Sequence, residues 1–112
     1  MNNPFESKRM PGCPDTDGIR DAHPEVVYFS STESVTVTTA MYGDRYVFGY
    51  SIYYENGRHV HTDPRPEFGL FATADDAMGY ALCLIRQKAR ISPDAMARVN
   101  TIIRQKQQLK MF

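Results

Sequence analysis

The segment His59-Val60-His61-Thr62-Asp63 holds the residue types best suited to chemistry in this chain. Histidines two residues apart on a β-strand point to the same face, and imidazole and carboxylate groups both bind zinc. His59, His61 and Asp63 are therefore candidate metal ligands. A catalytic zinc needs three protein ligands and a supporting layer of hydrogen bonds. The alternative is a pair of strand histidines followed by a turn at Asp63-Pro64.

This spacing is similar to part of the His-x-His-x-Asp pattern of metallo-β-lactamase-like hydrolases. Such a resemblance implies a small metal-dependent enzyme that uses His59 and His61, but Pro64 stands where that family has a further histidine. Cys83 lies on an apolar helical stretch, where cysteine usually acts as a small buried hydrophobe. We therefore expect no catalytic residue, no bound metal and no cofactor, and we favour a non-enzymatic protein.

The last five residues, Gln108-Leu109-Lys110-Met111-Phe112, form a second motif. They resemble the pentapeptide, usually Gln-Leu-Ser/Asp-Leu-Phe, by which bacterial DNA polymerases and repair proteins dock on the sliding clamp. The resemblance implies that Gln108 hydrogen-bonds at the rim of the clamp pocket, Leu109 and Met111 enter its apolar cleft, and Phe112 fills the deeper end. The alternative is packing, because Leu109 lies seven residues after Ile102 and could extend a helical apolar stripe.

Length and composition indicate one soluble domain. The chain has 112 residues, of which 42% are hydrophobic and 23% charged. No stretch approaches the length of a membrane span, and the first 25 residues lack the apolar core of a secretory signal. Two cysteines make no disulfide framework, which agrees with a reducing compartment. We expect a cytoplasmic bacterial protein without membrane contact.

The formal net charge of zero is the sum of two unlike parts. Residues 1–85 hold 6 basic and 12 acidic side chains, whereas residues 86–112 hold 7 basic side chains and 1 acidic. Zero net charge argues against a dedicated nucleic-acid binder, since phosphate neutralisation supplies much of the affinity. The basic C-terminal segment nevertheless allows DNA contact there.

The elements expected to position these residues are strands in the middle of the chain. Residues 26–29, 34–41 and 46–54 have strand patterns, and Gly43-Asp44 and Asn56-Gly57 are two-residue hairpin signals. The second turn sets Tyr54 opposite His59 and Ile52 opposite His61. One face then collects the apolar residues together with both histidines, and the other face is polar.

Two helices are expected after the strands. Thr73 with Asp76 resembles a capping box, and Ser92 followed by Pro93 is a helix start. The predicted fold is α+β, a three- to four-stranded antiparallel meander with two C-terminal helices packed on one face. Residues 1–24 are predicted to be a flexible tail, 25–107 the single domain and 108–112 a C-terminal tail.

The polar sheet face is a further candidate surface, with Arg45, Tyr53 and Arg58 as its binding residues. Its architecture looks like the sheet-plus-helix modules of plant AP2-type factors and integrase arm-binding domains, which lay a sheet into the DNA major groove. Those modules are strongly basic, whereas this face offers only two arginines.

The hypothesis from the sequence is a small interaction protein, an accessory of bacterial DNA replication, repair or a mobile element that docks on the sliding clamp. The alternative is a protein-binding or self-associating module, a homodimer for example, with the C-terminus packed on the core. It would use the side of the sheet that carries Tyr42 and Tyr53, or the edge formed by residues 26–29.

Overall fold

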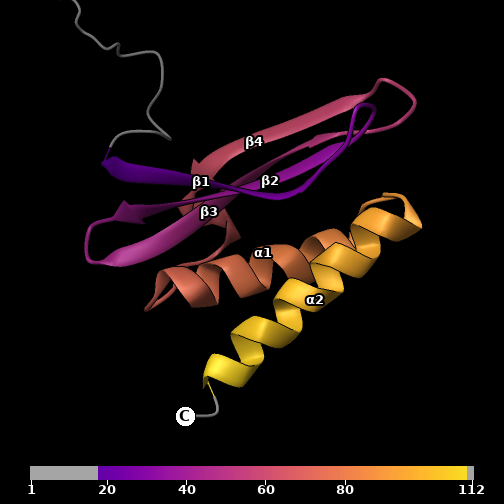
Figure 1. Cartoon of the computed structure of the whole chain (residues 1–112). Helices are drawn as coiled ribbons and strands as arrows, with labels where there is room; N and C mark the ends of the chain where they lie inside the picture. The colour runs from indigo at the N-terminus through magenta and orange to yellow at the C-terminus, as the bar shows by residue number, and fades with distance from the viewer. Residues whose placement is uncertain (1–17, 111–112) are drawn as a thin grey trace, which may run out of the picture.

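Within residues 18–110, which the structure describes, four strands form one antiparallel sheet and two helices follow it. The structure is a computed structural model. The elements are β1 (Ile19–Phe29), β2 (Ser34–Tyr42), β3 (Arg45–Tyr53), β4 (His59–Arg65), the 3₁₀ turn η2 (Pro66–Phe68), α1 (Ala74–Lys88) and α2 (Pro93–Lys110). The strands lie in the order β1-β2-β3-β4, and both helices cover the same side of the sheet (Figure 1). The predicted α+β meander with two C-terminal helices is confirmed.

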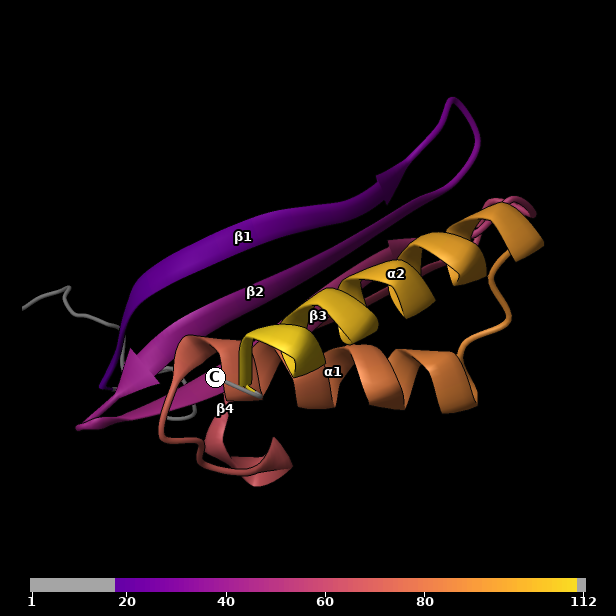
Figure 2. The same ribbon diagram turned by 60° about the horizontal axis from the view of Figure 1, so that its bottom comes forward.

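The core lies between this inner side of the sheet and the helices. α1 packs against β2 and β3, whereas α2 packs against β1 and α1. Figure 2 shows the two helices side by side and running in opposite directions. Apolar side chains at alternate strand positions meet the helical stripes, because each element buries one face. The buried core cluster is Val27, Val35, Val37, Phe48, Ile52, Ala77, Met78, Ala81, Leu82, Ile85, Val99, Ile102 and Ile103.

The β2–β3 hairpin has the register that its turn predicts. Tyr42 pairs with Arg45 and Met41 with Tyr46, across a two-residue turn at Gly43-Asp44. Gly43 has a φ of 65°, a value that favours glycine and that such tight turns require.

The predicted register of the β3–β4 hairpin is wrong by one residue. Tyr53, not Tyr54, pairs with His59, and His61 pairs with Ser51. The turn is a three-residue loop in which the Tyr54 amide donates to the Arg58 carbonyl at 2.8 Å. This register pairs Ile52 with Val60 toward the helices. A two-residue loop would have put both histidines on that face, because a shift of one residue reverses every side chain.

The sheet begins earlier in the chain than the predicted end of the N-terminal tail at residue 24. β1 begins at Ile19 and pairs with β2 along its length, with Pro24 opposite Thr38. Proline is tolerated because β1 is an edge strand, and two register shifts further interrupt its pairing. Residues 1–17 of the predicted tail lie outside the described part of the chain.

Both helices begin at the predicted caps. The Thr73 hydroxyl accepts from the Asp76 amide at 3.0 Å, and the Ser92 hydroxyl accepts from the Ala95 amide at 3.2 Å. Each bond satisfies an amide that has no partner within the helix.

Candidate functional site

Within residues 93–107 of α2, whose burial the structure describes, the buried side chains are Ala95, Val99, Ile102 and Ile103. The next position on that stripe is Lys106, whose Nζ lies 2.8 Å from Asp75 Oδ1 in the first turn of α1. The Lys106 side chain is 21% exposed, so its stem covers the core edge while its charge meets a carboxylate.

The motif itself is partly helical. α2 continues through Lys110, so Gln108, Leu109 and Lys110 lie in its last turn, where the sequence predicted a separate tail. Met111 and Phe112 lie outside the described residues. The predicted site therefore starts as the end of a helix, just beyond Lys106 and Gln107.

A groove adjoins this end of α2. Its volume is about 450 Å³, and its walls come from the segment before α1, from α1 and from α2. Leu70 and Tyr80 on these walls are exposed, and Lys106 and Gln107 line the end next to the motif. The groove therefore lies next to the residues that precede the motif in the chain. The packing alternative requires such a surface near the C-terminal residues.

The start of α2 is held by a buried carboxylate. Glu33, in the β1–β2 loop, is 3% exposed, and its two oxygens accept from the Ser92 amide at 2.8 Å and from the Ser92 hydroxyl at 2.5 Å. A negative charge at a helix N-terminus is favourable because the amide dipoles point toward it. This contact fixes the position of α2, and through α2 the origin of the C-terminal segment.

His59, His61 and Asp63 lie on the sheet face away from the helices, and their side chains do not point to one common position. His59 Nε2 lies 2.9 Å from Ser51 Oγ, whereas His61 Nε2 lies 2.8 Å from Asp63 Oδ1. The two imidazole rings are 6.0 Å apart, and each is engaged with a different side chain. No three His, Cys, Asp or Glu side chains within residues 18–110 are grouped so as to hold a metal ion. Ser51, His59 and Asp63 likewise form no Ser-His-Asp chain, because the carboxylate pairs with the other histidine.

The three predicted sheet-face residues are not brought together. Tyr53 stacks on His59, with ring centroids 3.9 Å apart, at one end of β3. Arg45 is exposed at the other end of that nine-residue strand, about 26 Å away at the usual rise per residue. Arg58 is on the opposite side of the sheet, because it faces Tyr54 across the three-residue loop.

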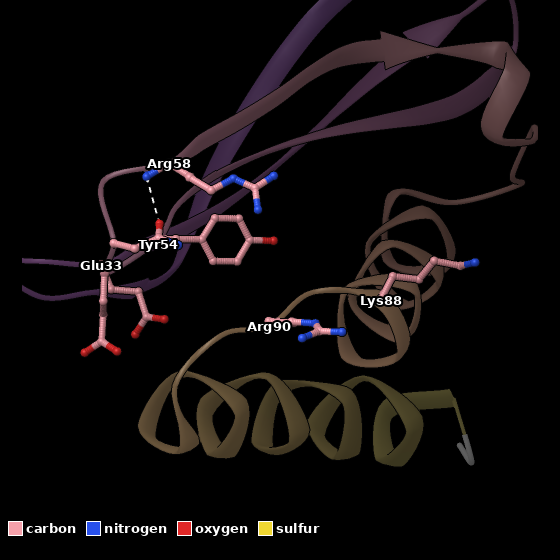
Figure 3. A pocket seen from close by; sticks show the side chains of 7 residues that line it. Glu33, Tyr54, Arg58, Lys88 and Arg90 are labelled. Carbon is pink, nitrogen blue, oxygen red and sulfur yellow. Dashed lines mark hydrogen bonds between the residues drawn. The ribbon is translucent and has the colours of Figure 1, made fainter.

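Arg58 instead lines a basic hollow beside the C-terminal end of α1, a feature that the sequence does not reveal. Its walls also include Tyr54, Lys88 and Arg90 (Figure 3). Lys88 and Arg90 are recognisable in the sequence as part of the basic segment. Their proximity to Arg58 depends on the register of the β3–β4 hairpin, which the turn signal alone does not determine.

The chain matches no protein-family model, no curated protein and no solved structure in comparisons with all three. None of the helices in residues 18–110 combines the length and the apolar character needed to cross a lipid bilayer. Function is therefore inferred from the residues themselves.

Proposed function

We propose that this protein is a non-enzymatic interaction module that docks on the bacterial sliding clamp through Gln108–Phe112. Two observations support the proposal. The pentapeptide matches clamp-binding peptides at Gln108, Leu109 and Phe112, with Met111 in place of the usual leucine, and the buried stripe of α2 is interrupted at Lys106, which is ion-paired with Asp75. The second observation carries the proposal, because a charged side chain at the next stripe position separates the motif from the buried stripe.

Each residue of the motif has a role in the proposal. Gln108 hydrogen-bonds at the rim of the clamp pocket, Leu109 and Met111 enter the apolar cleft, and Phe112 fills its deeper end. Clamp-binding peptides are extended when bound, so the last turn of α2 must unwind. Helix ends fray readily because their last carbonyls lack intrahelical partners, so this unwinding is inexpensive.

The proposed setting is a cytoplasmic bacterial assembly for DNA replication, repair or mobile-element transfer. Docking through the end of α2 would bring the basic residues 86–112 close to the DNA that the clamp encircles. Seven basic side chains against one acidic would then favour contact with phosphates.

The test is clamp binding by the intact chain and by a chain truncated after Gln107, measured by isothermal titration calorimetry. The truncation keeps the buried residues Ala95, Val99, Ile102 and Ile103 and the Lys106–Asp75 ion pair, so it is expected to fold. The proposal predicts saturable binding by the intact chain and none by the truncated chain. Equal binding by both chains, or no binding by either, would contradict it.

Self-association is the second candidate function, and the exposed end of β1 favours it. Phe29 is 78% and Val26 60% exposed, on a strand that has β2 on only one side. Apolar side chains of this size on a sheet edge are typical of pairing surfaces.

Light scattering on the intact chain and on F29D tests this second candidate. Self-association through this edge predicts a dimer mass that falls to the monomer mass in F29D. A monomer mass for the intact chain, or a dimer that F29D leaves unchanged, would contradict it.

A further inference from the structure

Three cationic side chains from separate segments line one hollow of the molecule. Arg58 comes from the β3–β4 loop, Lys88 from the last turn of α1, and Arg90 from the linker between the helices. The hollow has a volume of about 390 Å³, within the usual size range of small-ligand sites. In Figure 3 the Arg58, Tyr54 and Arg90 side chains extend away from Glu33 toward the side where Lys88 lies, and the Lys88 side chain continues in that direction, so that its ammonium is on the far side from the two guanidinium groups.

The charges of these three residues are not used within the described part of the chain. None of them forms an ion pair there, although two glutamates also line the hollow. Both oxygens of Glu33 are occupied by Ser92. Glu55 is an exposed loop residue with no ion-pair contact to Arg58, Lys88 or Arg90.

Helix stability explains part of this arrangement but not all of it. Basic side chains near the C-terminus of a helix interact favourably with its dipole, which accounts for Lys88. Arg58 belongs to no helix, and the hairpin loop carries it to the same place. That loop is itself held, since the Arg58 amide donates to Asn56 Oδ1 at 2.9 Å and the Gly57 amide to the Tyr54 carbonyl at 2.9 Å.

The chemistry of the lining matches a phosphate group. Guanidinium groups bind phosphate oxygens with two parallel hydrogen bonds, and an ammonium adds three donors on a compact charge. The Tyr54 hydroxyl supplies a further neutral donor beside them.

We infer that the basic hollow lined by Tyr54, Arg58, Lys88 and Arg90 binds a phosphate group, carried either by a nucleic acid or by a small phosphorylated molecule. This site shares no residue with the clamp-binding peptide Gln108–Phe112, although Lys88 and Arg90 belong to the basic segment 86–112.

The test compares two variants with the same change of charge. R58Q/R90Q removes the two guanidinium groups of the hollow, and R20Q/R45Q removes two exposed guanidinium groups outside the hollow and outside the basic segment 86–112, as the control. All four arginines are exposed, so both variants are expected to fold, and circular dichroism checks this. The probes are a short fluorescein-labelled DNA duplex, followed by anisotropy, and inorganic pyrophosphate, followed by calorimetry.

Three outcomes decide the inference. If only the hollow variant loses DNA affinity, and its salt slope falls by about 0.9 for each phosphate that is no longer neutralised, the hollow takes phosphates of nucleic acid. If pyrophosphate binds the intact chain and the control but not the hollow variant, the ligand is a small phosphorylated molecule. Equal effects of the two variants on both probes, or no binding of either probe by the intact chain, would overturn the inference.

Discussion

At the scale of single residues, Glu33 joins the sheet to the start of α2. It is the one buried charged residue among those the structure describes, and both its oxygens accept hydrogen bonds from Ser92, the residue that precedes α2. A carboxylate so enclosed is stable only because amide and hydroxyl groups replace the water that surrounds it in the unfolded chain. The β1–β2 loop and α2, which are 59 residues apart in the chain, are joined at this point.

Replacing Glu33 with alanine is expected to lower the free energy of unfolding by about 2–3 kcal/mol. The variant leaves the Ser92 amide without its partner and removes two hydrogen bonds to a charged group. Urea denaturation measures the change. Glu25→Ala is the matched control, because Glu25 is exposed, and its effect should stay within about 0.5 kcal/mol. Similar values for the two variants would show that the Glu33 contact is not stabilising.

Gly49 is a position that has no room for a side chain, because the backbone of β4 lies directly against it. A Cβ at this position would lie 2.3 Å from the Thr62 carbonyl oxygen and 2.5 Å from the Pro64 nitrogen. Backbone atoms of a paired strand cannot move aside as a flexible side chain can.

Gly49→Ala is therefore expected to destabilise the protein by about 3 kcal/mol or more, the upper range for an overpacked site. Gly79→Ala is the control of opposite sign. Nothing lies within 4 Å of a Cβ at Gly79 in α1, and alanine there should add about 0.5–1 kcal/mol of helix stability. Thermal unfolding of both variants checks the pair, and a stable Gly49→Ala protein would refute the close approach of β4.

At the scale of elements, local signals predict the helices well and the edges of the sheet poorly. Thr73 and Ser92 mark helix starts because a cap acts within four residues, and the turn at Gly43-Asp44 fixes β2 and β3. The sequence Asn56-Gly57 is compatible with loops of two or three residues. The choice between them is made by tertiary packing, which turns Val60 toward the helices in preference to a histidine. Residues 19–24 have no strand alternation of their own, and pairing with β2 makes them part of β1.

The candidate site likewise has one part that local sequence predicts and one part that depends on tertiary packing. The pentapeptide and the basic segment are visible in the sequence because they are contiguous. The basic hollow is not, since Arg58 lines the same hollow as Lys88 and Arg90 only because of the loop geometry and the packing of α1 on the sheet.

A single tryptophan in place of Phe112 distinguishes a free C-terminus from one packed in the groove beside α1. The chain contains no tryptophan, so the emission of F112W reports on this position alone. The docking proposal predicts the emission of a water-exposed indole in the native protein, unchanged when urea unfolds the chain. A blue-shifted native emission that moves to longer wavelength in urea would favour the packing alternative.

At the scale of the whole molecule, a net charge of zero conceals a strong separation of charge. Residues 86–112, which include the helix linker and α2, are basic, and the remainder of the chain is acidic. Opposite regions on different copies attract one another, and salt screens that attraction.

Light scattering at pH 7 should therefore show attraction between molecules at low salt that weakens as the ionic strength passes about 0.1 M, where the Debye length is about 10 Å. The triple variant R86Q/R98Q/R104Q, which reduces the basic region, should show a smaller effect of salt. An attraction that does not change with salt would contradict this, because it would show that the acidic and basic parts of the chain do not form oppositely charged surfaces.

Titration of a bacterial sliding clamp with the intact chain, with L109A/F112A and with Q107A tests the docking proposal most directly. Gln107 is an exposed residue immediately before the motif, so Q107A controls for changes in α2 itself. Docking through the pentapeptide predicts saturable binding by the intact chain and by Q107A with equal affinity, and its loss in L109A/F112A. Undiminished binding by L109A/F112A, or no binding by the intact chain, would contradict docking through these residues.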